Sequence, residues 1–512
     1  MTQGMPTTTT TRTTPRRRAG VEADHPHYKW WALSCTSAGM LLATINSGTL
    51  IIALPDLERA LHTSLLGLVW VILAYMIAST VLVLTAGRLS DLFGRKNAYV
   101  WGFVAFAAAS LGAGFAAGGT QLILWRILQG VGAAFLFANA AALVTDAFPR
   151  QELGLALGTN TMVAAVGLVL GPVLGGVLVS IRWEWVFWFN VPLALAAAAW
   201  GAVILRELAT PDTRRGLDLA GTAAYVVGLT GLVLAVSKGG LSGWNDPVVI
   251  GGLAAAAVLL PAFVAIEHRT PAPMLDLGIF RNRLFAAATG AAFINGLSRF
   301  ALMFVFVFYF QGVKGDDPVL AGVKLAPLAI GMLISSPLAG LWADRHGSRA
   351  LAALGMVVSA VGLALMTTLG VDSPYWQSSL WLLLVGIGSG MFNSPNTAAM
   401  MGTVPAHRRG IAAGARMMLQ NTGAVLSIAF VLAIVTAAVP KDVLLQIFSG
   451  LASGLTDRQL DPFIANMHTA LWVLAATSMV GAGVSLLRPA HVRHVPEESP
   501  RPAALAASEA GR

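Results

Sequence analysis

Long apolar segments alternate along the chain with short loops that carry most of its charge. Segments such as 66–86, 217–236 and 248–266 contain almost no charged residue. They approach or reach the roughly 20 residues that cross a bilayer as a helix. Because such segments recur along the whole chain, the pattern predicts a bundle of transmembrane helices rather than a water-soluble core.

About fourteen spans are expected, with boundaries that are loose by several residues. They are predicted at residues 31–53, 66–86, 98–117, 121–144, 156–180, 185–205, 217–237, 248–267, 284–312, 319–341, 350–370, 377–402, 410–438 and 465–487. An even number of spans puts both termini on the same side of the membrane. The loops on that side hold most of the Lys and Arg residues, and the opposite loops are acidic or nearly neutral. Both termini are therefore predicted to be cytoplasmic.

Composition supports a membrane location. Of 512 residues, 56% are hydrophobic and 11% are charged, against roughly 25% charged residues in an average soluble domain. The net charge of +9 could suggest nucleic acid, but the basic residues lie in loops between apolar segments, so we expect no nucleic-acid partner. The first apolar run lacks a small-residue cleavage site, so it is expected to be retained. The predicted location is the inner (cytoplasmic) membrane, as a multi-pass protein.

An internal repeat relates the two ends of this span pattern. Three residues recur 253 positions later, so that Gly87, Asp91 and Gly94 reappear as Gly340, Asp344 and Gly347. A second set recurs 256 positions later, with Gly130, Pro149, Gly154 and Gly158 matched by Gly386, Pro405, Gly410 and Gly414. Duplication of a six-helix half is how many secondary transporters place one site between two rocking domains.

The repeat predicts an all-α membrane fold of two six-helix bundles with two inserted helices. The expected parts are a disordered cytoplasmic tail at 1–28, a bundle at 29–208, two inserted transmembrane helices at 209–270, a second bundle at 271–490 and a disordered cytoplasmic tail at 491–512. The tails are rich in Thr, Pro, Ala and Arg, a composition typical of disorder.

A cluster of glycines and charges is predicted in a short cytoplasmic turn between the second and third spans. Its residues are Gly87, Arg88, Asp91, Gly94, Arg95 and Lys96. Glycines let helices approach closely, and the carboxylate can cap a helix or pair with a neighbouring Arg. With Asp146, Asp344 and Arg349, this cluster is expected to act as a gate between the halves. The alternative is a plain positive-inside loop.

The fifth predicted span carries a stripe of small residues. Gly167, Gly171 and Gly175 recur every four residues, Gly176 follows, and Pro172 weakens one helical turn. This stripe could be a sliding seam between helices, or ordinary close packing without motion.

These motifs resemble those of a known family. The segment GRLSDLFGRK resembles the signature between spans two and three of the major facilitator superfamily, and the likeness covers essentially residues 30–490. The segments LILWRILQGVG, GLVLGPVLGG and RWEWVFWFNVP are similar to its fourth-span motif, its fifth-span antiporter motif and the start of its sixth span. Together with fourteen spans, the resemblance implies the drug:proton antiporter branch, with a small-molecule substrate and a proton as the coupling ion.

One position departs from the family pattern. The first span of the family usually carries an acidic residue nine positions before the end of an Ala-Leu-Pro sequence, and here Ala53, Leu54 and Pro55 match but Asn46 holds the acidic position. The other predicted spans also have no central Asp or Glu. Proton coupling is thus implied by the resemblance alone. Coupling could be lost, or the proton could be carried by Asp91, Asp146 or the substrate.

The interior of the predicted bundle offers cations and amides instead. We expect a central pocket lined by Asn46, Arg126, Gln129, Asn295, Arg299, Met303, Phe306, Asn393, Asn396, Gln420 and Asn421. An arginine within a span is a functional-site hypothesis by default, and two uncompensated arginines favour an anionic or neutral amphipathic substrate over a cation. The alternatives are interhelical hydrogen bonding for the amides and snorkelling of Arg126 to the membrane surface.

The function predicted from these features is export of drugs or natural products by alternating access, with proton antiport. A lipid translocator on the same fold, or an efflux protein without proton coupling, remains an alternative. A membrane enzyme is disfavoured because the spans lack a cluster of catalytic or metal-ligating groups. Transport driven by nucleotide hydrolysis is disfavoured because the sequence has no phosphate-binding loop. We expect a monomer with no metal or cofactor.

Overall fold

The computed structural model describes residues 27–149, 152–207, 218–270, 273–402, 404, 409–437, 439–448 and 455–489. The two predicted tails lie outside these residues, apart from His27 and Tyr28.

Helices account for almost all of the described chain, and no β-strand occurs in it, which confirms the expected all-α fold. The elements are α1 (Tyr28–Ile52), α2 (Leu54–Leu61), α3 (Leu65–Phe93), α4 (Arg95–Ala113), α5 (Gly119–Ala147), α6 (Leu153–Ile181), α7 (Trp185–Trp188), α8 (Asn190–Ile204), α9 (Leu219–Ser242), α10 (Pro247–Arg269), η2 (Leu277–Arg281), α11 (Arg283–Phe308), η3 (Tyr309–Val313), α12 (Pro318–His346), α13 (Ser348–Met366), α14 (Tyr375–Gly402), α15 (Arg409–Val435), α16 (Lys441–Phe448) and α17 (Asp457–Leu486).

The long helices follow the predicted spans. Within the described ranges, eleven helices are long and apolar enough to cross a membrane. The helices α4, α6 and α14 lie at three further predicted spans. The sixth predicted span consists of α7 and α8, which meet at Phe189, and the ninth ends in the single π-helical turn η3. The short helices α2 and α16 were not predicted, because their charged residues made these segments read as loops.

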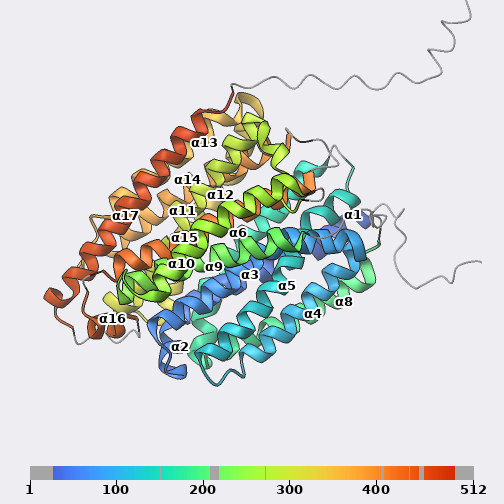
Figure 1. Ribbon diagram of the computed structural model, residues 1–512. Coiled ribbons are helices and arrows are strands. Elements are labelled where there is room, and N and C mark those ends of the chain that lie inside the picture. The colour runs from blue at the N-terminus through green and yellow to red at the C-terminus, as the bar shows by residue number, and fades with distance from the viewer. Residues whose placement is uncertain are drawn as a thin grey trace, which may run out of the picture.

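The helices run side by side, so that the bundle has two distinct ends (Figure 1). We call the end where α1 and α4 begin the basic end, and the other the opposite end. The helices α2 and α16 lie together at the opposite end. The basic end holds both copies of the repeated glycine and aspartate motif.

Each copy of this motif turns the chain at a single glycine. Gly94 has φ of +97° between α3 and α4, and Gly347 has φ of +89° between α12 and α13. Side chains other than glycine are disfavoured at such angles. The prediction that residues 87–96 form a short turn was therefore wrong in extent, since α3 continues to Phe93 and α4 starts at Arg95. Apolar runs underestimate helix length here because the last turns of α3 are polar.

The two halves meet along two seams, α6 against α12 and α3 against α15. The first seam is very close near the opposite end, where a Cβ added to Gly176 would lie 2.5 Å from the Pro318 carbonyl oxygen. A Cβ added to Gly322 would lie 2.4 Å from the Pro172 carbonyl oxygen. At the same end, the buried Gln311 side chain donates to the Ile52 carbonyl at 3.0 Å. The halves are thus in direct backbone contact there.

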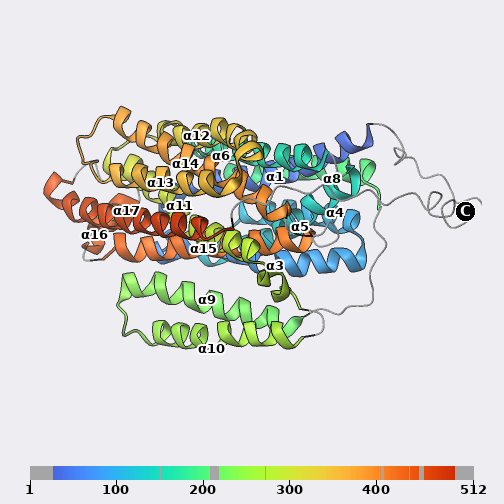
Figure 2. The same cartoon turned by 90° about the horizontal axis from the view of Figure 1, so that it is seen from above.

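The helices α9 and α10 form a hairpin beside the bundle (Figure 2). The helix α9 reaches both halves: Thr222 Oγ1 lies 3.2 Å from Thr85 Oγ1 of α3, and Tyr225 Oη lies 2.5 Å from Thr422 Oγ1 of α15. The helix α10 packs mainly on α9 and exposes most of its apolar surface. The hairpin therefore lies along the α3–α15 seam.

Candidate functional site

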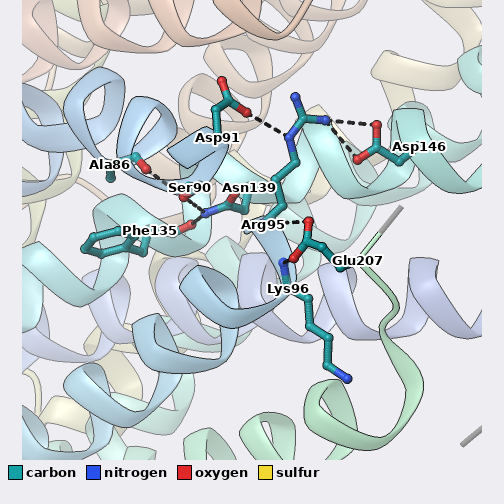
Figure 3. A network of polar contacts seen from close by, with 9 residues as sticks. All are labelled: Ala86, Ser90, Asp91, Arg95, Lys96, Phe135, Asn139, Asp146 and Glu207. Carbon is teal, nitrogen blue, oxygen red and sulfur yellow. Dashed lines mark hydrogen bonds and ion pairs between the residues drawn. The ribbon is translucent and has the colours of Figure 1, made fainter. Parts of the chain in front are cut away.

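The motif cluster at the basic end ties three helices of the first half together (Figure 3). Arg95 Nε donates to Asp91 Oδ1 at 3.0 Å, and Arg95 Nη1 donates to both carboxylate oxygens of Asp146 at 2.9 and 2.8 Å. These contacts join α3, α4 and α5. Asp91 therefore pairs with a neighbouring Arg, one of the two roles that the sequence suggested for it.

The other role, capping of a helix, belongs to a residue that sequence reasoning missed. The Glu207 carboxylate, just beyond the end of α8, accepts hydrogen bonds from the backbone N–H groups of Arg95 and Lys96, each at 3.0 Å. These are the first two N–H groups of α4, where a carboxylate also favours the helix dipole. Glu207 lies more than 100 residues from its partners, so no local pattern could reveal the contact.

The structure describes only some of the other residues of the predicted gate. Gly87 and Arg88 are helical within α3. In the second copy, Arg349 is exposed near the start of α13, while the side chain of Asp344 lies outside the described part of the structure. The described part of the structure therefore does not include a matching charge cluster in the second half.

The first half encloses a network of polar side chains around Arg126, which is 1% exposed. Arg126 Nε donates to the Val71 carbonyl at 3.0 Å, and Nη1 donates to Gln129 Oε1. The guanidinium carbon lies 4.3 Å from the centre of the Tyr75 ring. Arg126 points into the protein and not to the membrane surface, so the snorkelling alternative does not describe this structure.

Gln129 extends this network to Asn46. Gln129 Nε2 donates to Asn46 Oδ1 at 3.2 Å and to Ser110 Oγ at 2.7 Å, and Asn190 Nδ2 donates to the same Asn46 oxygen at 3.3 Å. Asn46, Gln129 and Asn190 are each at most 1% exposed. Three predicted pocket residues, Asn46, Arg126 and Gln129, are thus brought together inside the first half, where they are closed off rather than open to a cavity.

The second half holds two cations, Arg299 and Arg416, that are less enclosed than Arg126. Arg299 of α11 is half-buried; its Nη1 lies 3.5 Å from Met332 Sδ, and its guanidinium carbon lies 4.9 Å from the centre of the Phe300 ring. The buried Arg299 Nε has no hydrogen-bond partner among the described residues. None of the ion pairs formed within the described ranges includes Arg299 or Arg126.

A further arginine in the second half escaped the sequence analysis. Arg416 of α15 is half-buried; its Nη1 donates to Gln420 Oε1 at 2.6 Å, and its Nε is buried without a partner in the described structure. Gln420 Nε2 in turn contacts Asn393 Oδ1 at 3.4 Å. The signal was available, since Arg416 lies one helical turn before Gln420 on the same face. Asn421 beside Gln420 is also half-buried.

Other predicted pocket residues contact neighbouring helices within the second half. Asn295 Nδ2 lies 3.4 Å from Met356 Sδ of α13. Asn396 Nδ2 donates to the Ala288 carbonyl at 3.2 Å, and its Oδ1 accepts from Arg488 at 2.5 Å. Burial lowers the pKa of the Arg488 guanidinium to about 10, which leaves it charged at neutral pH. Asn295 and Asn396 are both 1% exposed, so they connect helices in this structure.

The predicted stripe of α11 ends in a buried aromatic cluster. Phe306 is fully buried and lies 5.8 Å from Phe310 and 5.6 Å from Tyr309, measured between ring centres. Met303 is also buried. This cluster is apolar packing that lies two to three helical turns beyond Arg299 along the chain.

The glycine stripe of α6 packs against α1. A Cβ added to Gly167 would lie 2.1 Å from Thr44 Oγ1, one on Gly171 would lie 2.8 Å from the Gly48 Cα, and one on Gly175 would lie 2.6 Å from the Thr49 carbonyl oxygen. Gly176 and Pro172 face α12 of the other half, as described above. The stripe therefore packs α6 tightly on one partner helix in each half.

The comparisons with known proteins agree with this architecture. A family model of the Major Facilitator Superfamily matches residues 36–428 and, separately, residues 288–509. The chain is 31% identical to the tetracenomycin C resistance and export protein of Streptomyces glaucescens, over 81% of this chain and 77% of that protein. It is 33% identical to the puromycin resistance protein pur8 of Streptomyces alboniger, over 83% of this chain and 85% of that protein.

A third relative has a broader name. The multidrug resistance protein Stp of Mycobacterium tuberculosis is 31% identical, over 78% of this chain and 74% of that protein. The paired halves, the apolar helices and the motif cluster fit the family that the model describes. The chain belongs to the Major Facilitator Superfamily and is a multi-pass membrane transporter rather than an enzyme.

Proposed function

We propose that this transporter exports amphipathic drugs or natural products, with a preference for anionic or neutral molecules, by alternating access and proton antiport. Three relatives carry names that refer to antibiotic or multidrug resistance, and one of these names also refers to export. Such substrates are partly apolar, so they can reach a transporter from the bilayer as well as from water. Export is the direction that confers resistance.

The observation that carries the substrate preference is the charge of the second half. Arg299 and Arg416 are half-buried on α11 and α15, and neither has a carboxylate partner among the described residues. A cation placed 4 Å from a fixed guanidinium is repelled by about 4 kcal/mol at an effective dielectric constant near 20. An anion gains a comparable attraction, and it would also supply acceptors for the unpartnered Nε groups.

Alternating access is supported by where the halves touch. The backbone contacts of α6 with α12 and the hydrogen bond from Gln311 to Ile52 lie at the opposite end. We assign the basic end to the cytoplasm, because the positive-inside rule places the Arg-rich loops there. The conformation is then one that is closed toward the outside, in the inner membrane, with both termini cytoplasmic. Export requires these contacts to separate.

Accumulation assays in cells that overproduce the protein test the substrate class. We expect lower accumulation of acidic and neutral amphipathic compounds than in vector controls. Arg299→Gln and Arg416→Gln should each reduce efflux of the acidic compounds about tenfold, equivalent to about 1.4 kcal/mol, and should leave neutral compounds nearly unaffected. The matched control is Arg458→Gln, which removes an exposed charge on α17. Efflux of lipophilic cations without efflux of acids would contradict the preference.

Proton coupling needs a separate measurement. In proteoliposomes, addition of a transported compound should drive proton movement in the direction opposite to the substrate. Active transport with no accompanying proton flux would exclude antiport while leaving the export function intact.

A further inference from the structure

Two acidic side chains meet at the basic end of the α9–α10 hairpin. Asp218 is the residue that precedes α9, and Glu267 lies in the last turn of α10. Glu267 is 3% exposed. Neither residue takes part in the motif cluster or in the arginine sites of the two halves.

One oxygen of each carboxyl group is satisfied by the backbone. Asp218 Oδ1 accepts the N–H of Gly221 at 2.7 Å, and Glu267 Oε2 accepts the N–H of Leu275 at 2.8 Å. The other two oxygens, Asp218 Oδ2 and Glu267 Oε1, are buried and have no donor in the described structure.

These two unpartnered oxygens both lie against Gly221. They lie 2.4 Å and 2.9 Å from one point, the position that a Cβ on Gly221 would occupy. The two oxygens are therefore no more than 5.3 Å apart. Two buried carboxylates this close repel each other, and one shared proton would supply the donor that both oxygens lack.

No described cation competes for this role. Among the described residues, the charged neighbour that influences Glu267 is Asp218, which is acidic. On α10 itself the neighbours His268 and Arg269 are exposed. From the following loop, Asp276 accepts the N–H of Gly278. From α3, the packing side chain beside Thr222 is the neutral Thr85.

We propose that Asp218 and Glu267 hold one proton between them, so that the pair is a proton-binding site of the inserted helices. The site lies one turn before Thr222, which contacts α3, and two turns before Tyr225, which contacts α15. Loss of the proton leaves two repelling charges at the base of α9, the helix that touches both halves. A role for this proton in transport rests on the proposed function. The binding of the proton by the two carboxyl groups does not depend on that function.

Infrared spectroscopy of the purified protein in lipid nanodiscs tests the site without any substrate. Between about pH 5 and pH 9, the wild-type protein should lose a protonated-carboxyl band that is absent from Glu267→Gln and from Asp218→Asn at every pH. Each amide can donate to the remaining carboxylate, so both variants mimic the protonated pair and should fold. Glu184→Gln is the matched control, since Glu184 is buried but paired with Arg182 at 2.6 Å; it should retain the band.

The pH dependence of thermal stability gives a second readout. A proton held by the folded protein and released by the unfolded chain makes stability fall as pH rises. The wild-type melting temperature should therefore fall over this pH range more steeply than that of Glu267→Gln. An unchanged band and an unchanged slope in Glu267→Gln would overturn the proposal. Neither readout depends on transport, so failure of the export function would leave this result interpretable.

Discussion

The two halves share a repeated sequence but treat their buried cations differently. In the first half Arg126 is fully enclosed, and its hydrogen bonds to Val71 and Gln129 join it to an amide network that reaches Asn46. The second half also encloses one arginine, Arg488, but its Arg299 and Arg416 are half-buried, and each of these two has a nitrogen without a partner in the described structure.

This difference separates structural from binding roles. A buried guanidinium with its hydrogen bonds satisfied contributes to the packing of its own half. A partly accessible guanidinium with unmet donors retains capacity for an external acceptor. On the proposed function, the first half is a support in this conformation, and the second half would carry the charges that a substrate contacts.

Removal of the enclosed cation should have the largest effect. Arg126→Met leaves the Val71 carbonyl and Gln129 without their donor, so we expect a stability loss of about 3 kcal/mol and loss of transport. Arg416→Met should lose less than about 1 kcal/mol, because its group is already only half satisfied. Thermal unfolding of the purified variants measures both. Equal losses of stability in the two variants would contradict the difference between Arg126 and Arg416.

The glycine turns provide a second comparison, of intermediate size. Gly94→Ala and Gly347→Ala both force a side chain into positive φ, which costs about 1–2 kcal/mol. At Gly94 the new Cβ would also lie 2.5 Å from Glu207 Oε2, the acceptor that caps α4. Gly94→Ala should therefore be less stable than Gly347→Ala by about 1 kcal/mol. Thermal melting of the two purified variants measures this difference. A higher melting temperature for Gly94→Ala than for Gly347→Ala would contradict the capping role of Glu207.

Asn46→Asp should have the smallest effect on stability. Asn46 Oδ1 already accepts two hydrogen bonds, and its buried Nδ2 has no partner in the described structure, so a carboxylate fits the site. We expect a stability change within about 1 kcal/mol and a rise of a few-fold in efflux of lipophilic cations, since a negative charge is added near Arg126. Dye accumulation measures this. Asn46→Leu is the control, because it leaves the side-chain donors Gln129 and Asn190 unpaired. Equal stability and equal dye accumulation in the two variants would contradict this prediction.

The sequence was sufficient for the fold because its signals are local. Apolar runs of helix-spanning length and the recurrence of Gly94 as Gly347 predicted the spans and the paired turns, and both are present. Even the error in the extent of the turn at 87–96 has a local cause, since the final turns of α3 are polar and were read as loop.

The site was less predictable because its contacts are distant along the chain. Residue types singled out Arg126, Gln129 and Asn46, but their joining into one network depends on how α1 and α5 pack. The cap by Glu207 and the closeness of Asp218 to Glu267 depend on which helix ends meet, and no periodicity in the sequence records that. The substrate-binding and gating roles of the predicted residues stay predictions.

The hairpin α9–α10 makes the two flanks of the transporter unlike. It covers the seam where α3 meets α15, whereas it leaves the seam of α6 with α12 uncovered. When the halves rock, Thr85 and Thr422 move relative to each other, and α9 must lose or exchange one of its contacts to them. On the proposed alternating access, the hairpin would therefore restrain the movement of the halves along one flank of the molecule only.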